Sequence, residues 1–146
     1  MKLSTKGRYG ARAALELALR YGSGAVMVRQ IAKSQDISVR YLEHILNALR
    51  AAGLVKSTRG ARGGYELAKP PSEITLGVIV RALEGPMDIV SCTGDRDCER
   101  IPECIMYDIW TEVKHAIDSV LDELTLEEMV RRHHELNRKK AYEYII

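Results

Sequence analysis

The chain has 146 residues and a formal net charge of +2, with 22 Lys and Arg against 20 Asp and Glu. This length holds one compact domain, or a small domain with a helical extension. No stretch reaches the roughly 20 apolar residues of a membrane span, and charged residues interrupt the apolar part of residues 1–22, which argues against a secretory signal. We therefore expect a cytoplasmic protein whose cysteines stay reduced.

Charge is unevenly distributed along the chain. Residues 1–70 contain 13 Lys and Arg against 4 Asp and Glu, a net charge of +9. Residues 71–146 contain 9 against 16, a net charge of −7. The first half therefore suits a polyanion such as DNA, and the second half does not.

The first predicted helix spans about residues 6–21 and ends at Gly22. Its N-terminus combines free backbone N–H groups with Lys6, Arg8 and Tyr9, which suits a phosphate anchor, although the same residues would also serve a solvated helix start. Its apolar stripe consists of Ala11, Ala14, Leu15, Ala18 and Leu19.

Residues 28–52 predict two helices about a short turn. The first begins at Val28 and ends near Gln35, Ile37 fills the turn, and Ser38 can cap the second helix with its hydroxyl. Gly53 ends the second helix. Its buried stripe has the spacing of an amphipathic helix and consists of Val39, Leu42, Ile45, Leu46 and Leu49. This pattern indicates a helix-turn-helix.

Polar side chains of the second helix point away from its apolar stripe. Arg40 and Asn47 can address base edges or phosphates. Glu43 can accept from a cytosine amino group, or it is a solvated charge in the first half of a helix. The predicted DNA-binding residues here are Ser38, Arg40, Tyr41, Glu43, Asn47 and Arg50.

A β-hairpin is predicted after the second helix. Residues 54–59 and 65–67 are strand-like runs, joined by a loop that contains three glycines. Such a loop can approach a phosphate backbone closely, and a narrow minor groove attracts arginine. Arg59, Gly60 and Arg62 are therefore predicted DNA-binding residues of a wing. The alternative is an ordinary helical pair followed by a glycine-rich hairpin.

All three cysteines fall within the next region. Thr75 begins a connecting helix that Gly85 and Pro86 end, and a loop without helical or strand period follows. In this loop Cys92, Cys98 and Cys104 are separated by two spacers of five residues. Thiolates suit an iron–sulfur cluster, zinc or copper(I), and metal-free redox thiols are a further alternative. A fourth cluster ligand is open, with Glu103, Tyr107 and Asp108 as candidates.

The longest periodic run covers residues 105–124. A helix of 20 residues reaches about 30 Å, and so long a stripe on a small protein suggests packing against a second copy, the alternative being a core helix of a monomer. The stripe consists of Met106, Trp110, Val113, Ile117, Val120 and Leu124. Thr125 then begins a capping box and a last helix, which ends in an apolar tail, residues 141–146, that is expected to be disordered.

The predicted fold is therefore mainly α with a small β-hairpin wing. We divide the chain into a winged helix-turn-helix DNA-binding domain (1–70), a connecting helix with a cysteine loop (71–104), and a dimerisation helix with a C-terminal helix or tail (105–146). A homodimer would bind a palindromic operator in double-stranded DNA.

Several segments together resemble the IscR-like, Rrf-two type family of iron–sulfur cluster regulators. The similarity covers nearly the whole chain and rests on residues 3–9, 38–49, 59–65 and 83–86 and on the three cysteines. The resemblance implies a homodimeric winged-helix repressor, with Cys92, Cys98 and Cys104 as ligands of a [2Fe–2S] cluster that selects among operators. It also implies that Glu43, on the recognition helix, restricts which DNA sequences are bound in the cluster-free state, and that Arg59 is the arginine of the wing.

One position departs from that pattern. Tyr107 stands where such regulators place a histidine ligand, three residues after the last cysteine. The tyrosine-rich tail ending in Ile146 instead resembles the cysteine-metabolism branch of the family, which lacks the cluster and acts with a cysteine-synthesising enzyme. A cluster-free regulator controlled by such a partner or by thiol oxidation is therefore the second hypothesis. A thiol or histidine enzyme that uses Cys98 or the His133–His134 pair is a distant third, because no C-x-x-C motif, nucleophile elbow or phosphate loop is present.

Overall fold

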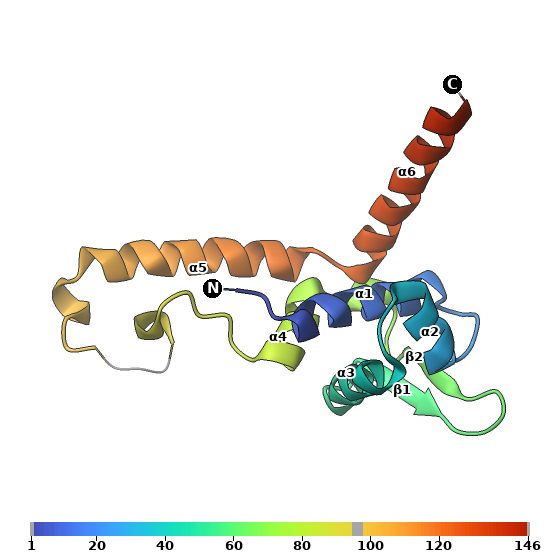
Figure 1. Ribbon diagram of the computed structural model, residues 1–146. Helices are drawn as coiled ribbons and strands as arrows, with labels where there is room; N and C mark the ends of the chain where they lie inside the picture. Colours follow the sequence, from blue (N-terminus) through green and yellow to red (C-terminus); the bar gives the residue numbers. More distant parts are fainter. Residues whose placement is uncertain (1, 95–97, 146) are drawn as a thin grey trace.

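The computed structural model describes residues 2–94 and 98–145 and is mainly helical with one β-hairpin (Figure 1), as predicted. The α-helices are α1 (Thr5–Leu19), α2 (Val28–Gln35), α3 (Val39–Ala51), α4 (Leu76–Glu84), α5 (Ile105–Glu123) and α6 (Leu126–Ile145). The strands are β1 (Val55–Thr58) and β2 (Gly64–Leu67), and short 3-10 turns cover Pro71–Glu73, Ser91–Thr93 and Ile101–Glu103.

Hydroxyl side chains cap the starts of α1, α3, α4 and α6. The Ser38 hydroxyl accepts from the Tyr41 N–H at 3.3 Å, and the Thr75 hydroxyl accepts from the Val78 N–H at 3.3 Å. Thr125 caps α6 in the same way, accepting from the Glu128 N–H at 3.1 Å. Each cap satisfies a backbone donor that the first turn of a helix leaves free.

The apolar stripe predicted for α1 was partly wrong. Ala14 and Ala18 are buried, but Ala11, Leu15 and Leu19 are only half-buried. The buried positions are Gly7, Gly10, Ala13, Ala14, Glu16, Leu17 and Ala18. This face is wider than a single stripe because α1 packs against α3, α4 and α6 at once. Gly7 and Gly10 let α4 approach closely, with Glu84 and Leu83 lying where their β-carbons would be.

Helices α2 and α3 form the predicted helix-turn-helix. Asp36 ends α2 in the left-handed conformation at φ 53°, and Ile37 is buried in the turn. Leu42, Ile45, Leu46 and Leu49 of α3 are completely buried. Val39, which was expected in that stripe, is 37% exposed because it lies at the first position of the helix, at the edge of the core.

Strands β1 and β2 pair antiparallel, with Val55 opposite Leu67 and Thr58 opposite Gly64. Val26 pairs with Tyr65 of β2 in an isolated antiparallel bridge, through two backbone hydrogen bonds of 2.8 Å. The hairpin is thereby fixed to the start of α2, and its loop extends from the helices (Figure 1).

The predicted DNA-reading unit, which consists of α1 to α4 with the hairpin, has one core that continues beyond residue 70. Ile74, Ile79, Leu83 and Leu126 belong to the same buried cluster as the residues of α1 and α3, and Leu126 is completely buried. Thr75 and Thr125 form an antiparallel bridge beside it, supported by 2.8 Å hydrogen bonds between the 74–76 and 124–126 backbones. The start of α6 therefore returns to the unit that contains α1.

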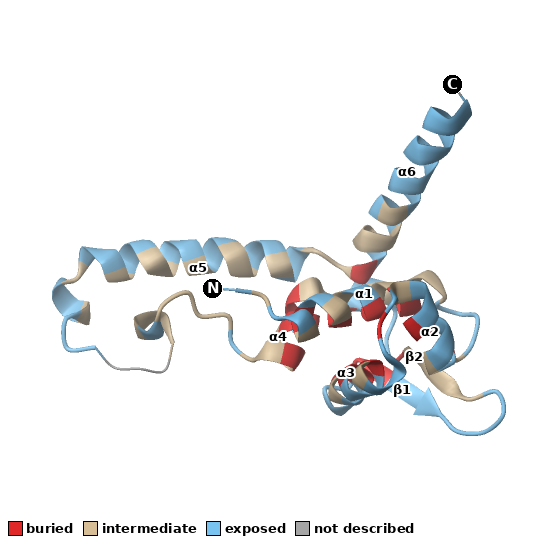
Figure 2. Ribbon diagram, viewed as in Figure 1, coloured by how far each residue is buried: buried red, intermediate tan, exposed pale blue. Residues whose placement is uncertain are grey.

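Helix α5 and the cysteine loop form an arm beside this unit (Figure 1). None of the residues of α5 is buried, and α6 is mostly exposed beyond its first turns, pointing away from the unit (Figure 2). The segment 141–145, expected to be disordered, continues α6 as helix. Among the described residues, no helix is long and apolar enough to cross a membrane.

Candidate DNA-binding surface and cysteine loop

Most of the predicted contact residues of α3 lie together on one exposed surface. All of them except Arg50 line a shallow hollow of about 480 Å³, formed by Ser38, Arg40, Tyr41, Glu43, His44 and Asn47. Glu43 has no hydrogen-bond or ion-pair partner within residues 2–94 and 98–145, so its carboxylate is free to meet a ligand. The helix thus presents cationic, amide and carboxylate groups on the side opposite its buried leucines.

The start of α1 adjoins this surface. Tyr9 meets Tyr41 edge to face, with ring centroids 6.1 Å apart, so the beginnings of α1 and α3 share one face. The predicted free N–H groups of α1 are partly engaged, however. The Ser4 hydroxyl accepts from the Gly7 N–H at 3.2 Å, and Glu84 accepts from the Ser4 N–H at 2.6 Å. Because an acidic side chain already lies there, Lys6 and Arg8 are better placed than the helix terminus to attract phosphate.

A second groove separates the wing from α2. It has a volume of about 430 Å³, and its lining includes Arg29, Arg50, Arg59 and Gly60. The Arg50 guanidinium donates to the Ser57 hydroxyl at 3.1 Å, which ties the end of α3 to β1. Arg62 is exposed in the wing loop outside this lining.

Arg29 was missed by the sequence-based prediction. It is an exposed cation at the start of α2, a helix that was considered only for its apolar side. The signal that could have found it is its place two positions before the buried Ile31, which puts it on the other side of the helix from that residue. Three arginines from α2, α3 and the end of β1 therefore meet around one groove.

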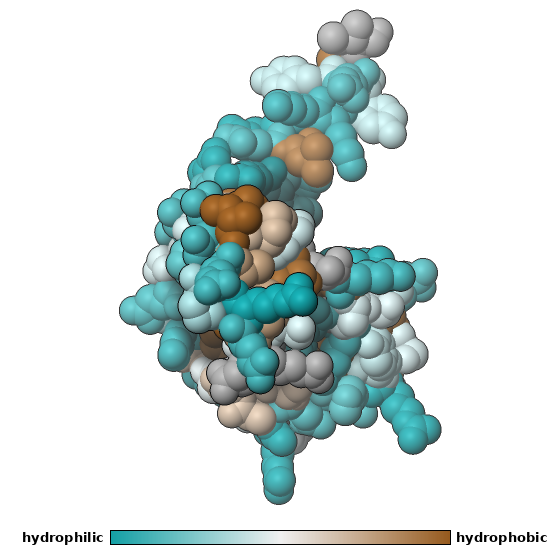
Figure 3. All heavy atoms as spheres, turned by 90° about the vertical axis from the view of Figure 1, so that its left-hand side faces the viewer, coloured by the Kyte–Doolittle hydropathy of each residue, from teal (hydrophilic) through white to brown (hydrophobic). Residues whose placement is uncertain are grey.

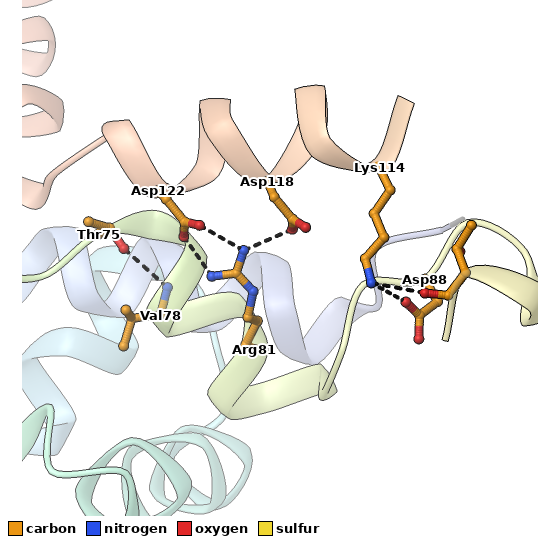
Figure 4. Close-up of polar contacts among 8 residues, drawn as sticks. Thr75, Val78, Arg81, Asp88, Lys114, Asp118 and Asp122 are labelled. Atoms are coloured by element: carbon orange, nitrogen blue, oxygen red, sulfur yellow. Dashed lines mark hydrogen bonds and ion pairs between the residues drawn. The ribbon is translucent and has the colours of Figure 1, made fainter. Parts of the chain in front are cut away.

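The cysteine loop is held at its first half by polar contacts with α5. Lys114 forms an ion pair with Asp88 at 2.6 Å and donates to the Thr93 carbonyl at 3.2 Å (Figure 4). The Asp88 carboxylate occupies the space where a side chain at Gly94 would lie. Cys92 lies inside this closed segment and is half-buried.

The other two cysteines are held differently. Cys98 is exposed, and Cys104 is half-buried at the start of α5, where its carbonyl accepts from the Tyr107 N–H at 3.1 Å. Asp95 and Asp97 fall outside the described residues. Among the residues that the structure describes, no three Cys, His, Asp or Glu side chains are grouped closely enough to hold a metal ion.

The donor set fits an iron–sulfur cluster in ligand type but is not assembled in a preformed site. Three thiols in one loop are the ligands that such clusters use. The loop would have to close around the group, as many metal sites do when folding and binding are coupled. Glu103, Tyr107 and Asp108 flank Cys104 at the start of α5, and their role as a fourth ligand stays a prediction.

An arginine clamp joins α4 to α5. Arg81 donates to Asp122 at 2.6 Å and to Asp118 at 2.8 Å (Figure 4). These hydrogen bonds raise the pKa of Arg81 above its ordinary value, and the bond from Arg81 lowers the pKa of Asp122. The clamp fixes one face of α5 against the DNA-reading unit.

The opposite face of α5 is apolar and uncovered. A hollow of about 440 Å³ lies along it, lined by Val113, Ala116, Ile117, Val120 and Leu121. Val120 is 65% exposed, and apolar side chains are visible on the surface when the molecule is viewed from the end of the arm (Figure 3). Val113, Ile117 and Val120 of the predicted stripe therefore lie on this face, whereas Leu124 lies beyond the end of α5, and nothing within the described part of the chain covers the face.

The histidine pair on α6 lies on an exposed part of the helix. His133 and His134 contact each other edge to face at 5.9 Å, and His133 lies 3.1 Å from the Asn137 amide. No described carboxylate or thiol joins them in a group that could hold a metal ion.

Comparisons with known proteins agree with this geometry. The family model Rrf2, described as "Iron-dependent Transcriptional regulator", matches residues 3–132. The HTH-type transcriptional regulator CymR of Bacillus subtilis is 43% identical over 129 residues, which cover 88% of this chain and 89% of that protein. The HTH-type transcriptional regulator IscR of Aliivibrio salmonicida is 38% identical over 130 residues, covering 89% and 77%.

Solved structures point the same way. The structure of CymR, titled the global cysteine regulator of B. subtilis, has a TM-score of 0.77 at 42% identity and covers 90% of this chain and 98% of its own. The structure of T. potens IscR also has a TM-score of 0.77, at 40% identity, and covers 93% and 90%.

Proposed function

We propose a function from one premise: the chain belongs to the Rrf2 family of transcription regulators. We infer that it is a homodimeric repressor that binds a palindromic operator in duplex DNA, in the cytoplasm. The observation that carries this proposal is that exposed polar and cationic residues line two hollows, one along α3 beside the start of α1 and one between the wing and α2. A helix and a wing so placed suit the major and minor grooves of one DNA segment.

The contact residues proposed are those of the sequence prediction. Arg40, Asn47 and Glu43 would face base edges, and Arg59 and Arg62 would enter the minor groove beside the wing. The other residues would contact the DNA backbone and so position the protein on it: Lys6, Arg8, Tyr9, Ser38, Tyr41, Arg50 and Gly60. Arg29 is added to this group from the structure. Replacing Arg59 by Ala should lower operator affinity about 5- to 150-fold if it reads the groove, as for other specific contacts.

Two copies would pair through the apolar face of α5. This face points away from the clamp with Arg81, so pairing leaves the DNA-binding surface of each copy open. The half-sites of the operator would then be related by the same two-fold axis as the protein.

Control would come from the cysteine loop. Cys92, Cys98 and Cys104 would hold a [2Fe–2S] cluster as thiolates, with Tyr107, Asp108 or Glu103 near a fourth position. When bound, the cluster would cross-link the loop in a manner that depends on iron and oxygen. The cysteine loop connects α4 of the DNA-reading unit to α5 of the arm. If the loop closed around a cluster, it would change the position of α5 relative to α4.

Analysis of oxygen-free protein tests the cluster. We expect equal amounts of iron and sulfide and a visible absorption band, both lost when any of the three cysteines is replaced by Ala. Operator binding should differ between the loaded and the iron-free protein. Colourless protein without iron after anaerobic reconstitution would contradict the cluster and leave the DNA-binding function standing.

A cluster-free regulator of cysteine or sulfur metabolism is the second candidate. It is favoured by the similarity to CymR, which equals the similarity to IscR in TM-score, and by Tyr107 in place of a histidine. A cysteine-synthesising enzyme would then bind the end of α6, where Tyr144 and Ile145 are exposed; Ile146 lies outside the described residues. This candidate predicts operator binding that is indifferent to iron and changes with the partner enzyme or with thiol oxidation.

A further inference from the structure

A polar network fixes the turn between α2 and α3. Gln35, the last residue of α2, uses both ends of its side-chain amide: the oxygen accepts from Arg12 Nε at 3.0 Å, and the nitrogen donates to Glu16 at 3.0 Å. Arg12 also donates to the Gln35 backbone carbonyl at 2.5 Å. The arginine therefore satisfies a carbonyl that the end of a helix leaves without an intrahelical partner.

The carboxylate in this network is buried. Glu16 is 7% exposed and pairs with Arg20 at 2.8 Å in addition to Gln35. A buried charge is costly unless it is paired and hydrogen-bonded. The Gln35 amide is therefore held in one orientation, with its nitrogen toward Glu16 and its oxygen toward Arg12.

The same arginine reaches the recognition surface. The Arg12 guanidinium lies 5.4 Å from the centre of the Tyr9 ring, and Tyr9 in turn meets Tyr41 in the first turn of α3. Neither ring interaction is strong alone, each being worth about 1 kcal/mol. Together they continue the network from the buried Glu16 to the first turn of the helix that presents Arg40 and Glu43.

We propose that Gln35 and Arg12 are positioning residues for specific DNA recognition, and this inference rests on the proposed DNA-binding function. They set where the turn ends and therefore how α3 enters the groove. They act through Tyr9 and Tyr41 and need not contact a base. Their removal should reduce the preference for the operator without removing a phosphate contact.

The competing explanation is that Arg12 contacts a phosphate directly, since its side chain is exposed. The two explanations differ in salt dependence. If Arg12 neutralises a phosphate, its removal should make the plot of log K against log salt concentration less steep by about 0.9, whatever the DNA sequence. A positioning residue changes the operator affinity and leaves that slope unchanged.

The experiment compares full-length variants on an operator, selected from random duplexes with the wild-type protein, and on a scrambled duplex. Gln35→Ala removes the amide without changing charge, and Arg12→Lys keeps the charge but cannot donate to both acceptors in the same way. Gln30→Ala is the matched control, because Gln30 is an exposed glutamine of the same helix. Thermal unfolding gives the folded fraction of each variant.

We expect Gln35→Ala and Arg12→Lys to lower operator affinity about tenfold, the effect typical of a broken polar network. Scrambled-duplex affinity and the salt slope should stay at wild-type values, and Gln30→Ala should bind as wild type. A merely destabilised protein would lose both affinities in proportion to its folded fraction, so only the ratio of the two reports positioning.

Two results would overturn the proposal. One is a Gln35→Ala protein whose ratio of operator affinity to scrambled-duplex affinity equals that of the wild type. The other is an Arg12→Lys protein with wild-type operator affinity, combined with an Arg12→Ala protein that has a reduced salt slope on both duplexes. If the wild-type protein itself prefers no duplex in the selection, the DNA-binding function fails as well, and that outcome is distinct from the other two.

Discussion

The DNA-reading unit and the arm differ in how they bury their apolar residues. The unit encloses its own core, because α1, α3 and α4 and the buried Leu126 of α6 pack around the completely buried leucines of α3. The arm has no buried residue in α5 and is joined to the unit by ion pairs. The unit therefore covers its own apolar residues, whereas no described residue covers the apolar face of α5.

The largest effect is expected in the core of the unit. Leu46→Ala removes a completely buried side chain and should lower the free energy of unfolding by about 2–5 kcal/mol, through reduced burial and a residual cavity. Leu136→Ala on exposed α6 is the matched control and should change it by less than about 0.5 kcal/mol. Urea unfolding measures both, and similar decreases in the two variants would contradict the contrast.

The next effect concerns the uncovered face of the arm. Val120→Asp places a charge in the proposed dimer interface and should raise the dimer dissociation constant at least about a hundredfold, because the charge would be buried without a partner. Ser119→Asp adds the same charge to α5 outside the apolar lining and should leave the dimer intact. Sedimentation of both variants decides the question. A monomeric wild-type protein at micromolar concentration would refute the pairing.

A smaller effect is expected at the clamp. Arg81→Met removes both ion pairs with α5 and should speed amide exchange around Asp118 and Asp122, at a cost of about 1 kcal/mol or less since these groups are partly solvated. The lowered pKa of Asp122 means that its contribution is present above its ordinary value of 3.8 and disappears as pH falls through the lower folded pKa. The difference between wild type and variant should therefore be equal at about pH 7 and about pH 5. A difference that grows or vanishes between these pH values would contradict the assignment.

The smallest effect is expected in the cysteine loop. Lys114→Met releases Asp88 and the Thr93 carbonyl and should speed alkylation of Cys92 about threefold by opening its segment. Removing the nearby positive charge alone would slow the reaction, so faster alkylation isolates the opening. Cys98, which is already exposed, is the internal control, and Lys114→Arg should keep the wild-type rate.

The contrast also explains which features could be predicted from the sequence. The bounds of α3, α4 and α5 followed from apolar spacing and from caps such as Ser38, because each of these helices buries or exposes one continuous stripe. The stripe of α1 was misplaced because a helix enclosed on several sides has no single stripe. The end of α6 was expected to be disordered because its isolated helix buries nothing that a pattern could detect.

Polar contacts between residues far apart in the chain could not be predicted from the sequence. Lys114 and Asp88 are 26 positions apart, and Arg81 and Asp122 are 41 apart, with no periodic signal to connect them. The DNA-binding residues could be predicted because they occupy the polar side of a recognisable helix-turn-helix. The ligand set of the cysteine loop could be predicted only as a group of thiols, since loop closure depends on what the loop binds.

The bridge between Thr75 and Thr125 has one last consequence. Because Thr75 and Thr125 are neighbours in the fold, the chain leaves and returns at one point, and residues 76–124 between them contain α4, which packs in the core, and α5, which lies outside it. The described residues of 85–124 include none that is buried, so this part of the chain can differ in sequence without changing the core. The same DNA-reading unit could therefore carry arms of different sequence, each of which binds a different chemical signal.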